Sequence, residues 1–596
     1  MPSSCPVPLQ LAIIGTGPTA LYTLKALIEQ APPCRIVLFE ESGTAGPGIP
    51  FSPAYNSPAA LANIAGVELP PLTETLNQWA RRQPEHRLER WGIGQDAGDE
   101  RAFFPRLALG AYFVDQLQQM LAHPRGHAII LREATRITDV IARADGVVLR
   151  WQASGKGETM EHEARDGEER FDRLVIATGY RAPRGRRGAP LGGRLGVELR
   201  RGGHVGVLGS SLSGIDVAVD LARRHGRFAG AGGSLRYVGD VDWHVTLLSR
   251  SGLLPEADFW FPHPAEPLDL FTDAALALLA RGRDGDLDRV FALFARQLRA
   301  LDPAYAEAID LAAATADTFA EHHFARRTAC DPFVWAARDL ADARRSHRRR
   351  EAEPWRYAIL RMHEPLGRIV PRLTPRDLAR FERGLKRCFI DNYAAVPHLS
   401  IHRLLAMHEA GVLSVARLGD RYTLQRDGEP WHIHAEGFDR HFDNILDARG
   451  QQALGLFDFP FPTLRLQLCA HALASGRDVE EGLSPDSGFV VDREDPALSR
   501  IHCLALPFLL KRNPFLQGLV ESDAMGKAAV TAMLGAMAAP GPCPLDRADV
   551  EEMIARLSSE SQIYCGSSGV VTIPNRQQGA ALTPPHRAAA QTGEWP

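Results

Sequence analysis

One short segment constrains this chain more than any other: an apolar run that breaks into glycines and then continues with a helical repeat. Residues 11–28 read LAIIGTGPTALYTLKALI, and the first four predict a short buried strand. After the glycines, Leu21, Leu24, Leu27 and Ile28 recur at the spacing of one helix face. A strand, a tight turn and a helix in this order predict the beginning of an α/β domain.

The turn itself has the composition of a site for a dinucleotide diphosphate. Gly15 permits a sharp turn out of the strand, Gly17 lets a diphosphate approach the backbone, and Ala20 lets the helix pack against the sheet. The first N–H groups of the helix then supply hydrogen-bond donors and partial positive charge. The predicted site comprises Gly15, Gly17, Pro18, Thr19 and Ala20.

The second predicted strand, residues 35–39, ends at Glu40, which lies 25 positions after Gly15. An acid about 20 residues beyond such a turn accepts hydrogen bonds from ribose hydroxyls, and we expect Glu40 to do so. The next residues, ESGTAGPGIPFSP, are rich in glycine and proline, and such a loop can wrap the ribityl chain and ring of FAD. The alternative is a glycine-rich turn of an α/β fold without a nucleotide, with Glu40 on the surface.

A second turn of the same kind occurs about 195 residues later. Residues 205–208 predict a strand and 215–222 a helix, and the turn between them reads GSSLSG, with Ser211 in place of the middle glycine. A serine is small, so the helix N-terminus can still meet a phosphate, although less closely. Just before this turn, residues 171–179 predict a strand that ends in Ala-Thr-Gly, whose small side chains let a dinucleotide lie against the sheet edge.

The strand predicted over residues 244–250 indicates which dinucleotide the second turn binds. It ends in Ser249 and Arg250, where an NAD site has an acid. Arg250 can pair with a 2′-phosphate through two hydrogen bonds, and Ser249 can donate its hydroxyl, so NADPH is favoured over NADH. The alternative is an ordinary surface arginine, because 41 residues separate Gly209 from Arg250. One chain with an FAD-like and an NADPH-like site is suited to hydride transfer between them.

These motifs resemble those of the two-dinucleotide-binding flavoproteins. More narrowly, the chain resembles the FAD-NAD(P)-binding family that is distantly related to flavin N-hydroxylating monooxygenases. Over residues 9–255 the resemblance depends on GTGPTA, GPGIPFSP with LANIAG, FPRLALGAYF, VIATGY, GVLGSSLSGIDVAVDLA and LLSRSGLLP, and a weaker match continues to about residue 535. It implies an α/β fold of two Rossmann-like dinucleotide-binding domains, for FAD and NADPH, with a helical insertion.

The resemblance also implies a role for individual positions. Pro50, Phe51 and Asn63 are expected in the loop near the flavin. Thr178 and Gly179 are expected to line the dinucleotide cleft. The residues implied to hold NADPH are Gly209, Ser210, Ser211, Ser213, Gly214, Ser249 and Arg250.

The reaction implied is that of an FAD-dependent, NADPH-using monooxygenase. Its partners would be O2 and a small-molecule substrate, an amine or amino acid that is N-hydroxylated through a flavin C4a-hydroperoxide. Since the cofactors carry this chemistry, no side chain is predicted to be catalytic. Two alternatives stay open: an NADPH-dependent flavin reductase or dehydrogenase, and a non-catalytic FAD/NAD(P)-binding protein.

Several motifs of related families are altered or absent in this chain, and these differences disfavour some classes of enzyme. Residues 447–450 read DARG where relatives often have a second Ala-Thr-Gly-like turn. No redox-active cysteine pair is present, which disfavours the disulfide reductases of this superfamily, and no FxGxxxHxxxW pattern is present, which disfavours Baeyer–Villiger enzymes. The neighbours His322 and His323 lack partners at ligand spacing, so no metal is predicted.

The rest of the chain predicts the domain organisation. Within the last third, residues 487–494 predict a pair of strands, and residues 524–539 predict a final helix whose N-terminus closes on the flavin. The predicted units are the first part of the FAD domain (1–200), the core of the NADPH domain (201–255), a helical insertion that forms a lid or substrate wall (256–400), return strands that complete both domains (401–540) and a partly disordered tail (541–596).

Charge and composition exclude several classes of protein. The net charge of −4 gives no field that favours nucleic acid, and no apolar run is long enough for a membrane span. Eight scattered cysteines predict no disulfide framework and favour the reducing cytoplasm. The basic stretch RRSHRRR, residues 344–350, is either a solvated helix face or an anion-binding entrance for NADPH or an acidic substrate. The oligomeric state is left open.

Overall fold

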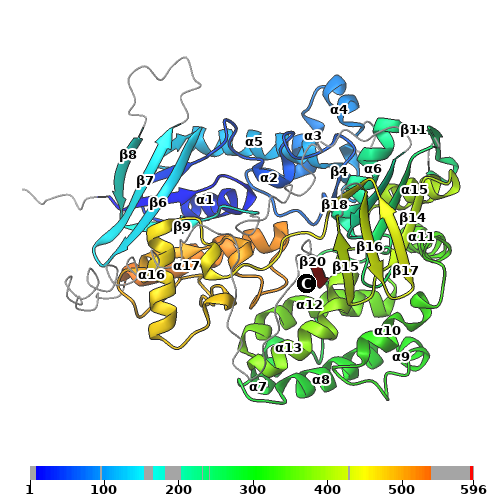
Figure 1. The fold of residues 1–596 in the computed structure, drawn as a ribbon. Helices are drawn as coiled ribbons and strands as arrows, with labels where there is room; N and C mark the ends of the chain where they lie inside the picture. Colours follow the sequence, from blue (N-terminus) through cyan, green and yellow to red (C-terminus); the bar gives the residue numbers. More distant parts are fainter. Residues whose placement is uncertain are drawn as a thin grey trace, which may run out of the picture.

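The structure is a computed structural model, and it shows two α/β lobes with a layer of helices below the second lobe (Figure 1). This agrees with the predicted fold class. The residues that the structure describes are 8–93, 97–153, 166–180, 203–230, 232–240, 242–426, 430–538 and 591–594.

The first lobe is built on a parallel sheet. In the described chain its five strands lie in the order β19-β9-β1-β2-β5. The strands are β1 (Gln10–Ile14), β2 (Arg35–Phe39), β5 (Ala128–Arg132), β9 (Arg173–Ile176) and β19 (Ile501–Cys503). This order places the carboxyl ends of β1, β2 and β9 side by side, so the segments that follow these strands meet at one edge.

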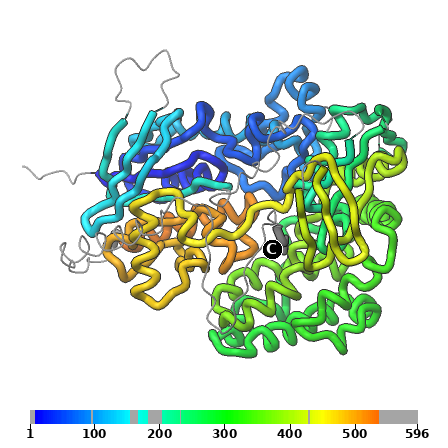
Figure 2. The backbone as a smooth tube through the Cα atoms, in the orientation of Figure 1, coloured from blue at the N-terminus to red at the C-terminus, as the bar shows by residue number. Residues whose placement is uncertain are grey.

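Two helices that lie far apart in the sequence pack against each other in the first lobe. Helix α1 (Pro18–Gln30) packs against α17 (Leu519–Ala538), and the backbone tube shows the late chain returning to the early chain (Figure 2). A Cβ atom on Gly526 would lie 2.8 Å from the backbone nitrogen of Thr23, so a glycine is needed for this close approach. Helix α17 begins at Leu519, five residues before the start that the sequence predicted for the final helix.

Further elements surround the first sheet. Residues 135–153 and 166–171 form an antiparallel sheet whose second strand lies between the other two. The elements are α2 (Gly48–Phe51), β3 (Leu61–Ala65), α3 (Leu76–Arg81), α4 (Glu85–Trp91), β4 (Phe103–Pro105), α5 (Arg106–Ala122), β6 (Thr135–Arg143), β7 (Gly146–Ala153), β8 (Asp166–Phe171) and α16 (Pro462–Ala474).

The strand pair predicted over residues 487–494 is wrong. Within this described segment the structure has turns, and Val490 makes one isolated bridge with His502. The side chain of Asp486 accepts hydrogen bonds from the N–H groups of Gly488 (2.8 Å) and Val490 (3.2 Å). Because a nearby side chain satisfies these donors, they do not pair with a neighbouring strand.

The second lobe is built on a second parallel sheet. Its four described strands lie in the order β14-β13-β10-β18. They are β10 (His204–Leu208), β13 (His244–Ser249), β14 (Leu413–Arg417) and β18 (Asn444–Asp447), with α6 (Leu212–His225) following β10. The insert between α6 and β13 forms a small hairpin of β11 (Gly226–Ala229) and β12 (Arg236–Gly239).

Other strands of the second lobe form a separate antiparallel sheet in the order β17-β16-β15-β20. They are β15 (Arg421–Gln425), β16 (Trp431–Ala435), β17 (Phe438–Phe442) and β20 (Gln591–Glu594). Apart from β20, the predicted tail over residues 541–596 lies outside the described residues.

A helical region connects β13 to β14. Its helices are α7 (Asp273–Leu279), α8 (Asp286–Leu301), α9 (Pro303–Ala308), α10 (Phe319–Thr328), α11 (Pro332–Arg349), α12 (Pro354–Ile369), α13 (Pro375–Arg383), α14 (Leu385–Tyr393) and α15 (His398–Glu409). Buried charges attach it to the second sheet: Glu256, shortly after β13, lies 3.7 Å from both Arg327 and Arg356. Removal of one member of such a cluster leaves an uncompensated buried charge, which costs about 3–5 kcal/mol.

Candidate dinucleotide-binding sites

The first glycine turn directly follows the carboxyl end of β1. Gly15 has φ +92°, and a Cβ atom there would lie 2.4 Å from the carbonyl oxygen of Ala177. The N–H of Gly15 donates to the carbonyl of Phe39 at 2.8 Å, which holds the turn against the end of β2. A Cβ atom on Gly48 would lie 3.1 Å from the Cα of Gly17, so the glycine-rich loop passes directly over the turn. Only glycine fits at Gly15, because of both its conformation and its neighbour.

The residues present at this turn fit a diphosphate. Helix α1 has Gly17 as its N-cap, no side-chain cap and no acid in its first turn, so its leading N–H groups are available to an anion. The hydroxyl oxygen of Thr178 is buried and has no hydrogen-bond partner among the described residues. Thr178 adjoins Gly15, so this unsatisfied hydroxyl lies beside the helix N-terminus. A bound dinucleotide would supply the missing partners.

Glu40 lies at the same edge and is oriented by its neighbours. The hydroxyl of Thr16 donates to Glu40 Oε2, and the N–H of Ser42 donates to Glu40 Oε1 at 2.9 Å. Each carboxylate oxygen accepts more than one hydrogen bond, so Glu40 retains capacity for a ribose hydroxyl. Sequence reasoning missed Thr16, although a hydroxyl residue between the two glycines was a readable signal.

The three positions expected near the flavin lie in different surroundings. Phe51 is buried against Phe113, with ring centroids 5.3 Å apart, and Pro50 beside it is exposed. The loop approaches α5 closely, since a Cβ atom on Gly110 would lie 2.3 Å from the carbonyl oxygen of Phe51. Asn63 is exposed on β3. The structure thus brings Pro50 and Phe51 to the loop over Gly17, and it leaves Asn63 on the neighbouring hairpin.

The second glycine turn repeats the backbone geometry of the first. Gly209 has φ +117°, and a Cβ atom there would lie 2.7 Å from the carbonyl oxygen of Ala448. The N–H of Gly209 donates to the carbonyl of Leu248 at 2.7 Å. The N–H of Ala448 donates to the carbonyl of Leu208 at 2.8 Å. A Cβ atom on Gly214 would lie 2.3 Å from the carbonyl of Gly209, so α6 packs tightly on the turn. The DARG segment therefore occupies the position that Ala-Thr-Gly has in the first lobe.

Arg449, in the DARG segment, changes the chemistry of this edge. Its guanidinium makes two hydrogen bonds to Asp447, at 2.9 and 2.7 Å, and these bonds raise the Arg449 pKa above its ordinary value. Burial and the nearby Asp447 also raise the pKa of Tyr180, which follows the Ala-Thr-Gly segment. Sequence reasoning noted DARG as a departure but assigned no role to Arg449.

The serines of the second turn have separate roles. Ser211 is the exposed N-cap of α6, which has no side-chain cap and no acid in its first turn. The first N–H groups of α6 are therefore available to an anion, as those of α1 are. Ser210 is buried, and its hydroxyl donates to the carbonyl of Leu253 at 2.6 Å. Ser213 is half-buried in the first turn of α6.

Arg250 follows β13 beside a second arginine. Burial and the charge of Arg387 lower the pKa of Arg250, and Asp420 lies 4.0 Å from its guanidinium. Ser249 is buried, and its hydroxyl oxygen accepts a hydrogen bond from the N–H of Gly252 at 3.0 Å. The like charges of Arg250, directly after β13, and Arg387, on α14, favour an anion there.

One ion pair joins the two lobes near these turns. Arg106, the first residue of α5, lies 2.9 Å from Asp216 on α6, and both side chains are largely buried. Asp216 has a raised pKa because burial outweighs the effects of Arg106 and Arg403. The pair fixes α6 against the first lobe. Among the described residues, no group of three or more His, Cys, Asp and Glu side chains is arranged to hold a metal ion.

Comparison with known proteins agrees with this geometry. The model of the FAD-NAD(P)-binding family matches residues 12–181, and that of the YdhS-like middle domain matches residues 272–393. With its two glycine turns, the molecule is an FAD- and NAD(P)-binding flavoprotein. The chain is 37% identical over 549 residues to Uncharacterized protein YdhS of Escherichia coli (strain K12), covering 88% of this chain and 97% of that protein. It therefore belongs to the YdhS family.

Solved structures also resemble the chain. Ornithine N-hydroxylase KtzI of Kutzneria sp. 744 is 13% identical, with a TM-score of 0.44, and the match covers 89% of this chain and 100% of that one. The ornithine hydroxylase PvdA of Pseudomonas aeruginosa is 10% identical, with a TM-score of 0.43, and the match covers 88% and 99%. In the described part of the chain, no helix is both long enough and apolar enough to cross a bilayer.

Proposed function

We propose that this protein is an NADPH-dependent flavin monooxygenase that N-hydroxylates a small amine or amino acid. The observation that carries the proposal is the pair of matching glycine turns, in which Gly15 lies against Ala177 and Gly209 lies against Ala448. When bound, FAD accepts a hydride from the nicotinamide and passes electrons to O2, which is the chemistry that an oxygenation requires.

In this proposal the first lobe binds FAD through three groups of the chain. The free N–H groups at the start of α1 bind the diphosphate, since they point to where an anion is favoured. Glu40, held by Thr16 and Ser42, accepts from the ribose. The unsatisfied hydroxyl of Thr178 donates to the cofactor at the cleft edge.

The second lobe binds NADPH in a more strongly positive setting. The N–H groups at the start of α6 bind the diphosphate, and Arg449 adds a charge beside them that the first lobe lacks. Arg250 and Arg387 bind the 2′-phosphate, and the anion relieves their mutual repulsion. These arginines are the reason for proposing NADPH over NADH.

The substrate would lie where the helical region meets α17. Thr19 on α1 and Ser522 on α17 lie 3.0 Å apart, so the start of α17 adjoins the FAD turn. One residue earlier, Glu521 lies 3.7 Å from His363 of the helical region. Burial lowers the His363 pKa, but Glu521, the Leu360 carbonyl and Glu364 together outweigh burial and raise the pKa above its ordinary value. We propose this contact as part of the substrate wall, where His363 can hold a proton.

The test is to add NADPH to the purified protein without oxygen and then to admit air. A monooxygenase loses its yellow colour with NADPH, consumes O2 in the presence of the right amine, and yields a product heavier by one oxygen atom. A product search by mass spectrometry over amines and amino acids identifies the substrate. Bleaching followed by release of all the reducing equivalents as hydrogen peroxide, whatever amine is present, would support a reductase instead. Absence of bleaching would support a binding protein.

A further inference from the structure

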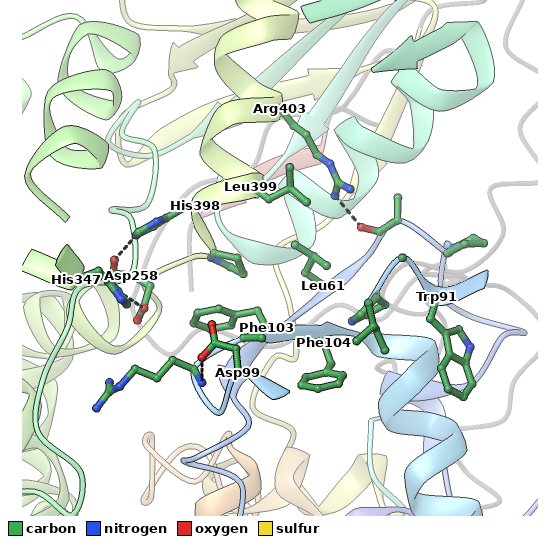
Figure 3. A pocket seen from close by; sticks show the side chains of 18 of the residues that line it. Leu61, Trp91, Asp99, Phe103, Phe104, Asp258, His347, His398, Leu399 and Arg403 are labelled. Carbon is green, nitrogen blue, oxygen red and sulfur yellow. Dashed lines mark hydrogen bonds and ion pairs between the residues drawn. The ribbon is translucent and has the colours of Figure 1, made fainter. Parts of the chain in front are cut away.

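A cavity of about 730 Å³ lies apart from both glycine turns. It is open to solvent and is lined by the β3–β4 hairpin and α4 of the first lobe, and by α6, α11 and α15 on the other side (Figure 3). No residue predicted to hold FAD or NADPH is among its described lining residues. A cavity of this size suits a small organic ligand.

Its lining carries an excess of positive charge. Figure 3 shows His347 and His398 converging on Asp258 at one side of the cavity, and Arg403 at another. The Asp258 carboxylate already has a partner in the protein, because it lies 3.0 Å from His347 Nε2. The described charged residues of the lining are six arginines and three acids: Arg90, Arg101, Arg223, Arg344, Arg348, Arg403, Glu89, Asp99 and Asp258.

Several of these arginines have no partner in the part of the chain that the structure describes. Among the described residues, Arg223, Arg344 and Arg348 have no ion pair and no hydrogen bond. Arg403 donates to the carbonyl of Ala59 at 2.9 Å, and burial and the neighbouring Arg223 lower its pKa to about 10. Guanidinium groups crowded in this way are stabilised by a carboxylate or phosphate.

Apolar side chains form another part of the lining. Leu61, Phe103 and Leu399 lie between the histidine side and Arg403, and Leu399 is 37% exposed although its neighbours in α15 are packed (Figure 3). Trp91, at the end of α4, is half-buried and also lines the cavity. A ligand that contacts both the arginines and the apolar side chains of the lining needs an anionic group and an apolar portion.

We propose that this cavity, which we term the arginine cavity, binds a small organic anion with a phosphate or carboxylate at one end and an apolar ring or chain at the other. The basic stretch over residues 344–350 then has two faces. Arg344, His347 and Arg348, at helical spacing, line the cavity, whereas Arg345 and Arg349 do not line it, and all four arginines are accessible to solvent. The site does not depend on the proposed redox reaction.

The test is calorimetric titration of the full chain with phenyl phosphate, benzoate and inorganic phosphate at one fixed ionic strength. We expect phenyl phosphate or benzoate to bind at least tenfold more tightly than inorganic phosphate, and the tighter of the two identifies the anionic group. In the double variant Arg344→Gln, Arg348→Gln the affinity should fall at least tenfold. In the matched variant Arg345→Gln, Arg349→Gln it should not change, although both variants lose the same charge from the same helix.

Two results would overturn the proposal: no binding of either ring-bearing probe, or equal loss of affinity in both double variants. Flavin content and NADPH bleaching should be the same in both variants, so a failure of the redox function is distinguished from a failure of this site. If the double variant does not fold, Leu399→Ser serves instead, and it should remove the preference for phenyl phosphate over inorganic phosphate.

Discussion

The first and second glycine turns place a left-handed glycine at the end of a parallel strand, and each glycine lies against the carbonyl of an alanine on a neighbouring strand. Around this shared backbone the side chains differ. The first turn has Thr178, whose hydroxyl is unsatisfied, and the carboxylate of Glu40. The second has Arg449 and Arg250. Under the proposed function, the same backbone geometry would bind a diphosphate at both turns, and the adjoining side chains would determine which dinucleotide binds.

The largest effect is expected from the glycines, and it should separate the two sites. Gly15→Ala places a Cβ atom against the Ala177 carbonyl in a backbone conformation that costs about 1–3 kcal/mol for other residues. We expect loss of bound FAD, measured by visible absorbance. Gly209→Ala should keep the yellow colour and lose bleaching by NADPH.

The matched control is Gly43→Ala. Gly43 lies in the loop after β2, and a Cβ atom there would have no atom within 4 Å. This variant should bind both cofactors normally. Equal loss of flavin in the Gly15 and Gly209 variants would contradict the separate assignment of the two turns.

The next effect concerns the dinucleotide preference of the second turn. Arg250→Gln should weaken NADPH binding about 10- to 100-fold, because a hydrogen bond to a charged group contributes about 1.5–3 kcal/mol. Binding of NADH should change little, since it lacks the 2′-phosphate. Stopped-flow bleaching rates against concentration of each nucleotide measure both affinities. Asp420→Asn removes the acid beside Arg250 and should not weaken NADPH binding. Parallel losses for NADH and NADPH would assign Arg250 a structural role instead.

A smaller effect is expected from substitutions at Thr178, beside the first turn, and at Arg449, beside the second. Thr178→Val preserves shape but removes the unsatisfied hydroxyl, so FAD affinity should fall about 2- to 10-fold, as for a hydrogen bond of about 0.5–1.5 kcal/mol. Flavin fluorescence during dilution measures this loss. Arg449→Thr gives the second turn the threonine of the first, and it should weaken NADPH while leaving FAD unchanged. An unaltered flavin affinity in Thr178→Val would show that this hydroxyl does not contact the cofactor.

The smallest difference between the lobes is expected in their response to acid. Each sheet holds a histidine with a lowered pKa. Desolvation lowers the pKa of the buried His502 on β19 and of the half-buried His204 on β10 from 6.5 to about 4, and His244 and Arg440 add to the effect at His204. The unfolded chain therefore binds more protons between these pH values, and the free energy of unfolding falls as pH falls from about 6.5 to about 4.

Urea unfolding at several pH values measures this dependence. His502→Asn keeps a donor for the Gly488 carbonyl, which lies 2.9 Å from Nδ1, and it should flatten the curve of the first lobe. His204→Asn should do the same for the second. An unchanged slope in either variant would mean that the other titrating groups dominate.

The sequence predicted those parts of the fold whose signals are local. Residues 35–39 were predicted as a strand and are β2, and both glycine turns lie at the ends of parallel strands as expected. The helical character of the region after residue 256 was also readable, because apolar spacing depends only on nearby residues. The strand pair over residues 487–494 was predicted wrongly, because Asp486 satisfies the backbone donors that a neighbouring strand would need.

The sequence alone thus determined where two strand–turn–helix units occur, since glycine conformation and apolar periodicity are properties of a few consecutive residues. Only the tertiary structure decided which atoms lie beside them. The Gly209 turn meets Ala448, α1 meets Gly526 of α17, and the basic residues of α11 face the β3–β4 hairpin. These partners come from distant parts of the chain, and their contacts depend on the packing of whole sheets and helices, which no local pattern encodes.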